Sequence, residues 1–137
     1  MRVVIDTNVL ISAIFWTGKP KQVLNKVRRG EITFLTSEFI LEEIRDVLTR
    51  EDTPFKLSAE EAERIVTEMR NLAVVVKIGS HVSVCKDEND NKVLDCAIDG
   101  NANCIITGDS HLLQLSSFQK IDIMTVSDFL GHLKKGN

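Results

Sequence analysis

The sequence contains few of the residues that mark secreted, membrane-spanning or low-complexity proteins. Among 137 residues there are only two prolines, and the three cysteines are Cys85, Cys96 and Cys104. An odd number of cysteines, without a CxxC or Cys/His pair at metal-ligand spacing, argues against a disulfide framework and fits a reducing compartment. No apolar run approaches the ~20 residues that span a bilayer, and Arg2 brings a charge too early for a secretory signal. We therefore predict a cytoplasmic protein without a membrane segment.

The length of the chain limits the number of domains that it can form. A chain of 137 residues fits one compact domain, and no repeat or interdomain linker is visible, so we predict a single domain over residues 1–137 with its core at about 1–133.

The net charge of −3 provides no general attraction to nucleic acid. The charges are nevertheless unevenly distributed. One run is basic and fits either a solvated helix face or an RNA-tracking patch: Lys19, Lys21, Lys26, Arg28 and Arg29. A second run is acidic: Asp87, Glu88, Asp90, Asp95 and Asp99.

Short β-branched runs alternate with helical periodicities along the chain. Strands are expected at 2–5, 32–36, 74–78, 104–107 and 121–124, with helices at 9–15, about 20–30, 37–49, 58–73, 90–101, near 112 and after 125. Ser58 and Glu61 form a capping-box signature. Strands separated by helices indicate right-handed crossovers. We predict an α/β fold in which a parallel sheet of four or five strands carries helices on both faces, in three layers.

Two aspartates follow predicted strands at the edge where such sheets bind ligands. Asp6 comes directly after the first strand, and Asp109 follows the 104–107 strand after one glycine. Helix capping would also explain each of them. If the two strands are neighbours, the carboxylates lie about 5 Å apart and repel by ~3 kcal/mol at an effective dielectric of 20. Such an arrangement requires a compensating cation or proton uptake.

The helical wheel of residues 90–101 separates its acidic residues. At ~100° per residue, Asp90 is in line with the apolar stripe, whereas Asp99 lies opposite and Asp95 lies beyond the edge of the stripe. A carboxylate on a buried face is costly unless it is paired, caps the helix or binds a cation. Asp90 is therefore either a site residue or the N-cap of this helix.

The wheel of residues 37–49 distinguishes two adjacent glutamates. Glu43 lies at the border of the apolar stripe, and Glu42 points into solvent. Glu43 therefore joins Asp6, Asp90 and Asp109 as a candidate site residue. The alternative is that Glu43 is an ordinary boundary residue whose charged end reaches into solvent.

An all-oxygen site favours Mg²⁺ or Mn²⁺ over zinc. The three histidines, His81, His111 and His132, are isolated in the sequence.

Four motifs combine in a specific order and spacing. They are Asp6-Thr7-Asn8-Val9-Leu10, the run from Thr36 to Ile44 with Ser37 and Glu43, Asp87 and Asp90 before the run from Val93 to Ala97, and Ile106-Thr107-Gly108-Asp109. Over essentially its whole length, the chain resembles the PIN-domain family, particularly the small stand-alone proteins grouped with VapC-type toxins.

This resemblance implies divalent-metal-dependent endonucleolytic cleavage of single-stranded RNA. It places Asp6, Glu43, Asp90 and Asp109 in the catalytic quartet, with Mg²⁺ or Mn²⁺ held by Asp6, Asp90 and Asp109. It also implies that Asn8 and Thr107 support the quartet by hydrogen bonding, and that Asp95 is a further candidate metal ligand. A toxin role would add an antitoxin partner and a homodimer, whereas a housekeeping RNA-processing enzyme would need neither.

The substrate contacts are only weakly indicated by the sequence. Candidates for holding the RNA backbone are Lys19, Lys21, Arg28 and Arg29. Trp16 either stacks on a base or is a packing residue.

Two alternative functions remain. A receiver-like signalling module would need a phosphoacceptor aspartate and a lysine after a late strand, but the chain continues there with Thr125-Val126-Ser127. Phosphatases with a DxDxT motif fit worse, because Asp6-Thr7-Asn8 lacks the second aspartate. The other alternative is an inert PIN scaffold that acts only through protein contacts, against which the intact quartet argues.

Overall fold

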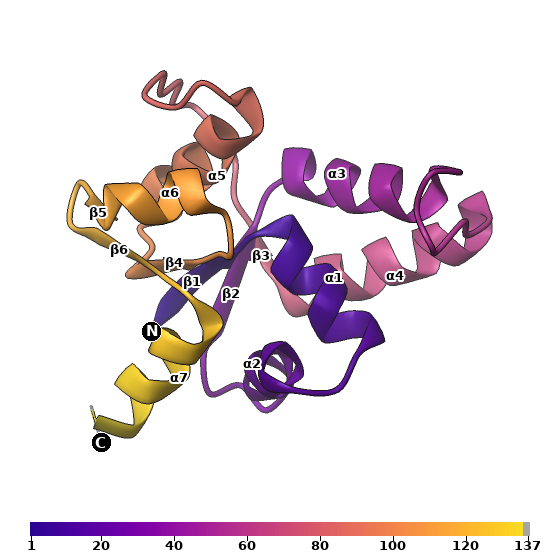
Figure 1. Cartoon of the computed structure of the whole chain (residues 1–137), viewed down its shortest axis with the longest axis horizontal. Helices are drawn as coiled ribbons and strands as arrows, with labels where there is room; N and C mark the ends of the chain where they lie inside the picture. Colours follow the sequence, from indigo (N-terminus) through magenta and orange to yellow (C-terminus); the bar gives the residue numbers. More distant parts are fainter. Residues whose placement is uncertain (136–137) are drawn as a thin grey trace.

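Six short strands form one sheet in the order β3-β2-β1-β4-β6-β5 in the computed structural model, which describes residues 1–135 (Figure 1). The strands are β1 (Arg2–Ile5), β2 (Thr33–Thr36), β3 (Val74–Val75), β4 (Cys104–Ile106), β5 (Ser117–Phe118) and β6 (Ile121–Met124). All five predicted strands are present and parallel to one another. The predicted α/β fold is confirmed. The sheet also has one strand that was not expected, because β5 pairs antiparallel with β6.

Seven helices connect and flank these strands within the described residues. They are α1 (Thr7–Phe15), α2 (Lys19–Arg28), α3 (Glu38–Thr49), α4 (Ala59–Leu72), α5 (Glu88–Asp99), α6 (Ser110–Leu115) and α7 (Val126–Lys135). In Figure 1, α5 and α6 lie on one side of the sheet, and α2 and α7 lie on the other. Within residues 1–135, no helix combines the length and the apolar character needed to cross a membrane. Residues 136–137 of the predicted domain lie outside the described part.

The direction of the chain across the sheet reverses between β1 and β4. The first three strands are laid down in one direction, β1 to β2 to β3, and α5 then carries the chain back to β4 on the other side of β1. At the carboxyl end of this central pair, Ile5 is opposite Ile106. A crevice for ligands is expected at such a switch point, outside the carboxyl ends of the strands.

Side-chain caps determine where the helices around this edge begin. Asp6 caps α1, Ser37 caps α3, and Asp109 caps α6. The predicted capping box of Ser58 with Glu61 is present at the start of α4. The N-cap of α5 is Asp87, whose side chain accepts the Asn89 N–H. The capping explanation for Asp90 was therefore wrong, because its carboxylate lies within the first turn of α5.

The buried polar side chains are concentrated in one part of the molecule. The sheet interior is apolar, with Val3, Val4, Leu35 and Ile105 completely buried. The polar residues that are also buried all lie at the carboxyl ends of β1, β2 and β4 or on α5: Thr7, Thr36, Ser37, Asp90, Asn91, Asp95 and Thr107. Buried polar groups are costly unless they have partners, and most of these side chains form hydrogen bonds, but one oxygen each of Thr36, Asp90 and Asp95 has no partner within the described residues.

One face of α5 holds the extended segment 79–85 by hydrogen bonds at intervals of about one helical turn. The Asp99 carboxylate accepts the N–H groups of Gly79 and Ser80, Asp95 accepts the Val82 N–H at 2.9 Å, and Asn91 exchanges two bonds with the Cys85 backbone. We call these three side chains the α5 ladder. Asp95, a candidate metal ligand from the sequence, uses Oδ1 for this bond, and its buried Oδ2 has no hydrogen-bond partner within the described residues. The ladder also anchors the start of α5, and with it Asp90.

Candidate active site

Thr107 joins the turns that follow β1 and β4. Its hydroxyl donates to Asp6 Oδ2 at 2.7 Å and accepts the Asp109 N–H at 3.0 Å, and its side chain is completely buried. The Asp6 N–H also donates to the Ile106 carbonyl at 3.0 Å. These contacts hold the two aspartates beside each other, as expected if β1 and β4 are neighbours. The predicted supporting position of Thr107 agrees with this geometry.

Glu43 reaches the same edge from α3. Its Oε1 accepts a hydrogen bond from the Thr7 hydroxyl at 3.1 Å, and the residue is partly buried. Glu42 is exposed and pairs with Arg45, so the predicted difference between the two glutamates is confirmed. Thr7 was not predicted to take part, although its position next to Asp6 could have indicated it. Asn8 lines the hollow beside Asp6.

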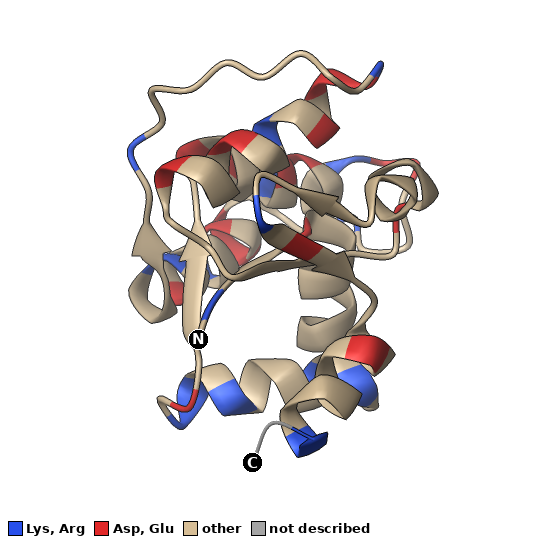
Figure 2. Cartoon of the chain, turned by 90° about the vertical axis from the view of Figure 1, so that its left-hand side faces the viewer, with Lys and Arg blue, Asp and Glu red and all other residues tan. Residues whose placement is uncertain are grey.

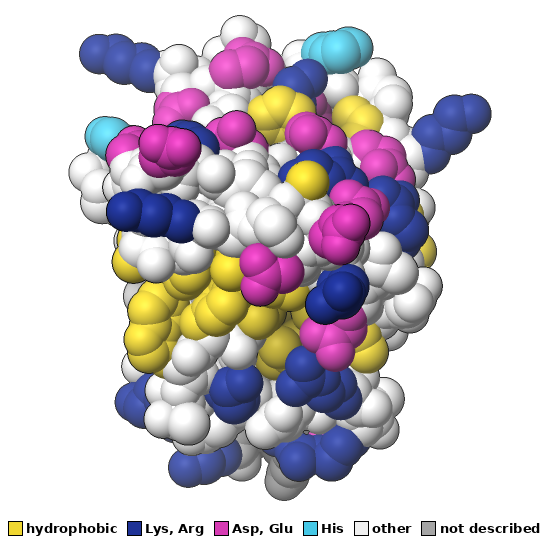
Figure 3. Space-filling view, turned by 90° about the vertical axis from the view of Figure 1, so that its right-hand side faces the viewer, with side chains coloured by type: hydrophobic (Ala, Val, Ile, Leu, Met, Phe, Trp, Pro, Cys, Tyr) yellow, Lys and Arg dark blue, Asp and Glu magenta, His cyan; other side chains and the backbone are white. Residues whose placement is uncertain are grey.

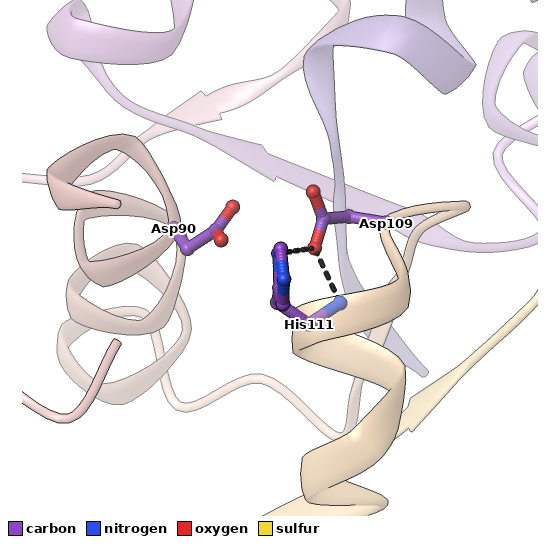
Figure 4. Close-up of side chains that lie close together, drawn as sticks. All are labelled: Asp90, Asp109 and His111. Carbon is purple, nitrogen blue, oxygen red and sulfur yellow. Dashed lines mark hydrogen bonds and ion pairs between the residues drawn. The ribbon is translucent and has the colours of Figure 1, made fainter. Parts of the chain in front are cut away.

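Three side chains from α5 and α6 converge at the centre of this edge. One potential ligand atom from each of Asp90, Asp109 and His111 lies within 4.8 Å of the other two. Figure 4 shows the Asp90 carboxylate facing Asp109 and His111 across the space between the two helices. The expectation that His111 is isolated was wrong. Its place two residues after Asp109, at the start of a short helix, was the signal that sequence reasoning missed.

The electrostatics of the cluster reflect its burial and its like charges. Burial first, and then the charges of Asp109, Asp87 and Asp6, raise the pKa of Asp90 to about 6. Burial is also the main reason that the pKa values of Asp6 and Glu43 are raised. Raised pKa values mean that it is unfavourable for all of these carboxylates to be ionised together, unless a bound proton or cation reduces the negative charge. The local balance of charge therefore favours the uptake of protons or of a cation.

The donor atoms can be compared with what a divalent cation requires. Asp90 is only 6% exposed, and its Oδ2 has no hydrogen-bond partner within the described residues. Asp109 Oδ1 accepts the N–H groups of His111 and Leu112, which leaves its other oxygen for a ligand. Carboxylate oxygens suit Mg²⁺ and Mn²⁺. The residues present therefore fit a divalent cation between α5 and α6.

Two hollows flank the carboxylates. One, of about 460 Å³, is lined by Asp6, Asn8, Ser12, Pro20 and Asp109 among others. The second, of about 550 Å³, is lined by Asp90 together with Val84, Lys86, His111 and Gln114 among others. An extended polymer passing from one hollow to the other would cross the acidic cluster.

The four predicted backbone-binding residues fall into two pairs. Lys19 and Lys21 are the sequence neighbours of Pro20, which lines the first hollow. The Lys19 ammonium donates to Ser127 and the Lys21 ammonium to the Ile14 carbonyl. Arg28 and Arg29 lie at the opposite end of α2 and pair with Glu68 and Glu31. Figure 2 shows that lysine and arginine gather on α2 and α7. Of the two pairs, only the lysines are adjacent in sequence to a residue that lines the hollow beside Asp6.

Trp16 belongs to an exposed aromatic cluster at the end of α1. Its ring packs edge-on against Phe15 and Phe55, with centroid distances of 6.2 and 5.8 Å. Trp16 remains 53% exposed and Phe15 37% exposed. Figure 3 faces this side of the molecule, where a hydrophobic area separates a lower part rich in lysine and arginine from an upper part rich in acidic residues. Trp16 thus has ring partners of its own, although much of it faces solvent.

The fold and the site together define an α/β protein with an acidic cluster at the switch point of its sheet. The chain belongs to the PIN domain family, since the model of that family matches residues 2–111. It is 34% identical over 122 residues to the uncharacterized protein MJ1680 of Methanocaldococcus jannaschii, a match that covers 88% of this chain and 78% of the relative. The PIN-domain resemblance inferred from the sequence motifs is confirmed.

A solved structure shares the fold. VapBC2 from Rickettsia felis, bound to a DNA fragment from their promoter, contains a chain that superimposes with a TM-score of 0.63 at 13% identity, covering 90% of this chain and 97% of that one. PIN domains are in general nucleases that bind divalent metals, and the acidic cluster fits this chemistry. The receiver-like and DxDxT alternatives do not agree with the family.

Proposed function

We propose that the protein is a cytoplasmic, divalent-metal-dependent endoribonuclease that hydrolyses single-stranded RNA, with Asp6, Glu43, Asp90 and Asp109 as its catalytic residues. The observation that carries the proposal is the buried Asp90 carboxylate, which has an unpartnered oxygen and faces Asp109 and His111. A buried carboxylate without a partner is costly, and a bound cation would remove that cost.

Each residue has a role that follows from its contacts. Asp90 and Asp109 would hold the ion directly, and Asp6 would hold it directly or through water. When bound, the ion would lower the pKa of the attacking water and offset negative charge on the scissile phosphate and the leaving oxygen. Thr107 keeps the Asp6 and Asp109 turns in place. Glu43, with Oε1 engaged by Thr7, keeps an oxygen that can orient the attacking water.

The proposed reaction is hydrolysis of one phosphodiester bond. The oxygen of the attacking water forms a bond to phosphorus, and the bond from phosphorus to the 3′ oxygen breaks. The 3′ oxygen takes up a proton and leaves as a hydroxyl, while the attacking water loses one. The products therefore carry 5′-phosphate and 3′-hydroxyl ends, because no 2′-hydroxyl takes part in the attack.

The two hollows support a single-stranded substrate. A strand that lies across the carboxylates would place one side near Asn8 and Pro20 and the other near Val84 and Gln114. Lys19 and Lys21 are the sequence neighbours of Pro20, which lines the first hollow, and are the residues we assign to phosphate contacts there. We assign Arg28 and Arg29 a weaker contribution, because they lie at the far end of α2 in ion pairs.

A matched pair of glutamate variants tests the assignment of Glu43. We expect Glu43→Gln to lower the cleavage rate of single-stranded RNA in Mn²⁺ by about 100-fold, the lower end of what a positioned base contributes, because the attacking water loses a charged acceptor. Glu42→Gln, one residue away and exposed, should leave the rate unchanged. The measurement is a time course on structured and unstructured RNA and on single-stranded DNA, with and without EDTA, followed by analysis of the product ends.

The same experiment separates the nuclease from an inert PIN scaffold. Cleavage that stops in EDTA and yields 5′-phosphate ends would support the proposal. A protein that shows no cleavage of any of these substrates in Mg²⁺ or Mn²⁺ would be a scaffold. Equal activity of the two glutamate variants would remove Glu43 from the catalytic set.

We further propose that the protein is a toxin that forms a homodimer and binds an antitoxin protein. The support is the fold shared with a VapBC2 chain and the exposed aromatic cluster, since exposed apolar surface is typical of protein contacts. A housekeeping RNA-processing enzyme with the same site would need no such partner.

Growth measurements distinguish these two roles. Induced expression of the wild-type chain in a bacterial host should reduce colony-forming units by at least about tenfold, since unrestrained RNA cleavage inhibits translation. Asp6→Asn, expressed to the same level, should not reduce them. Normal growth with the active wild-type protein would favour the processing role.

A further inference from the structure

His111 lies at the acidic cluster although it has no place in the quartet. It is the second residue of α6, and its Nδ1 is 3.9 Å from Asp109 Oδ1. The side chain is 75% exposed, so the ring is free to move toward or away from the cluster. In Figure 4 the ring stands between the two helices, on the side of Asp109 that faces Asp90.

Asp90 provides an independent indication that a ligand belongs at this point. Its side chain is more than nine-tenths buried, and Oδ2 has no hydrogen-bond partner within residues 1–135. The carboxylate points toward His111 as well as toward Asp109. One atom of each of these three residues lies within 4.8 Å of the others, so one ion could contact all three.

We propose that His111 is a nitrogen ligand of the divalent ion held by Asp90 and Asp109, and that it gives the site a preference for Mn²⁺ over Mg²⁺. The inference rests on the proposed function, since it concerns the ion of that same site. Both ions accept carboxylate oxygens, but Mg²⁺ is smaller, keeps several of its waters and is bound through oxygen. Mn²⁺ is the first member of the series of first-row divalent metals that bind nitrogen as well as oxygen ligands. An imidazole at this position therefore adds affinity for Mn²⁺ and little for Mg²⁺.

A second interpretation of the same geometry makes the opposite prediction. If His111 only forms an ion pair with Asp109, its positive charge competes with the cation for that carboxylate. Removing the imidazole would then leave Mn²⁺ affinity unchanged or increase it. The two interpretations differ in the sign of the effect.

The test measures metal binding by the full-length chain rather than its activity. Calorimetry with Mn²⁺ and with Mg²⁺ is performed on the wild type, on His111→Ala and on Gln114→Ala, which removes another side chain from the same hollow. Pulsed electron paramagnetic resonance of bound Mn²⁺ reports directly on nitrogen coupling from an imidazole. The positions tested on α6 are exposed or partly exposed, so both variants should fold.

We expect His111→Ala to weaken Mn²⁺ binding by at least about tenfold, the lower end of losses found when metal-site residues are changed. Mg²⁺ binding should change much less, the nitrogen coupling should disappear, and Gln114→Ala should resemble the wild type. Wild-type Mn²⁺ binding without nitrogen coupling, or equal losses for both ions, would overturn the inference and leave the nuclease proposal intact. If the wild type binds neither ion, the nuclease proposal fails with it.

Discussion

Asp90→Asn and Asp109→Asn should each lower RNA cleavage by at least about 100-fold, because each removes a charge that holds the ion responsible for several kcal/mol of transition-state stabilisation. The fold should persist in both variants. In Asp109→Asn, the new amide keeps an oxygen that can cap α6, where Asp109 Oδ1 now accepts two N–H groups. In Asp90→Asn, the buried amide can donate to the Asp109 carboxylate that it faces. Loss of activity would therefore report on chemistry rather than on unfolding.

Initial rates of RNA cleavage in saturating Mn²⁺, together with circular dichroism, provide the measurement. Asp122→Asn is the matched control, since Asp122 is an exposed aspartate on β6. It should retain full activity. Rates for Asp90→Asn and Asp109→Asn within about threefold of the wild type, in folded protein, would falsify the assignment of the site, because the loss of one ligand charge cannot be so small at a metal centre.

The second large effect is on stability, which should depend on pH and metal in a way that Asp90 controls. In the folded protein without a cation, the pKa of Asp90 is about 6, against the ordinary value of 3.8. A raised folded-state pKa means that the folded state binds more protons than the unfolded state between these values, so stability falls as the pH rises through this window. Asp6 and Glu43, whose pKa values are also raised, act in the same direction.

Thermal unfolding in EDTA should therefore give a melting temperature at pH 7.5 that is lower than at pH 5 by on the order of 5 °C, equivalent to about 1–2 kcal/mol. Divalent cation at about 100 times its Kd should restore about 2.7 kcal/mol at pH 7.5. Asp90→Asn should lose most of both effects because it no longer titrates or binds the ion. An Asp90→Asn protein with the same pH and metal response as the wild type would show that other groups cause it.

The elements that the sequence predicted well are those whose signal is local. Asp6 and Asp109 follow short apolar strands, and the neighbouring position of those strands explains why two distant aspartates meet. The wheel of α3 separated Glu43 from Glu42 because their side chains differ in direction by about 100°. Asp90 was picked out in the same way, although its helix begins two residues earlier than expected.

The features that the sequence did not predict depend on contacts between distant segments. A two-residue strand such as β5 has no periodicity to detect. Of the expected strand 74–78, only Val74 and Val75 belong to the sheet. The chain that follows runs along α5 and is hydrogen-bonded to its side chains. His111 was missed because its exposure makes it resemble any surface histidine, and only the packing of α6 against the sheet brings it to Asp90.

The α5 ladder has a consequence for how the length of this protein can vary among its relatives. Ladder residues four apart on the helix are separated by about 6 Å, and two residues of extended chain span about 6.6 Å. Ser80 and Val82 therefore meet Asp99 and Asp95 with almost no slack. Adding or deleting one residue between them would turn the N–H groups away from their acceptors. Insertions and deletions should thus be excluded from this short stretch, even though it belongs to neither a helix nor a strand.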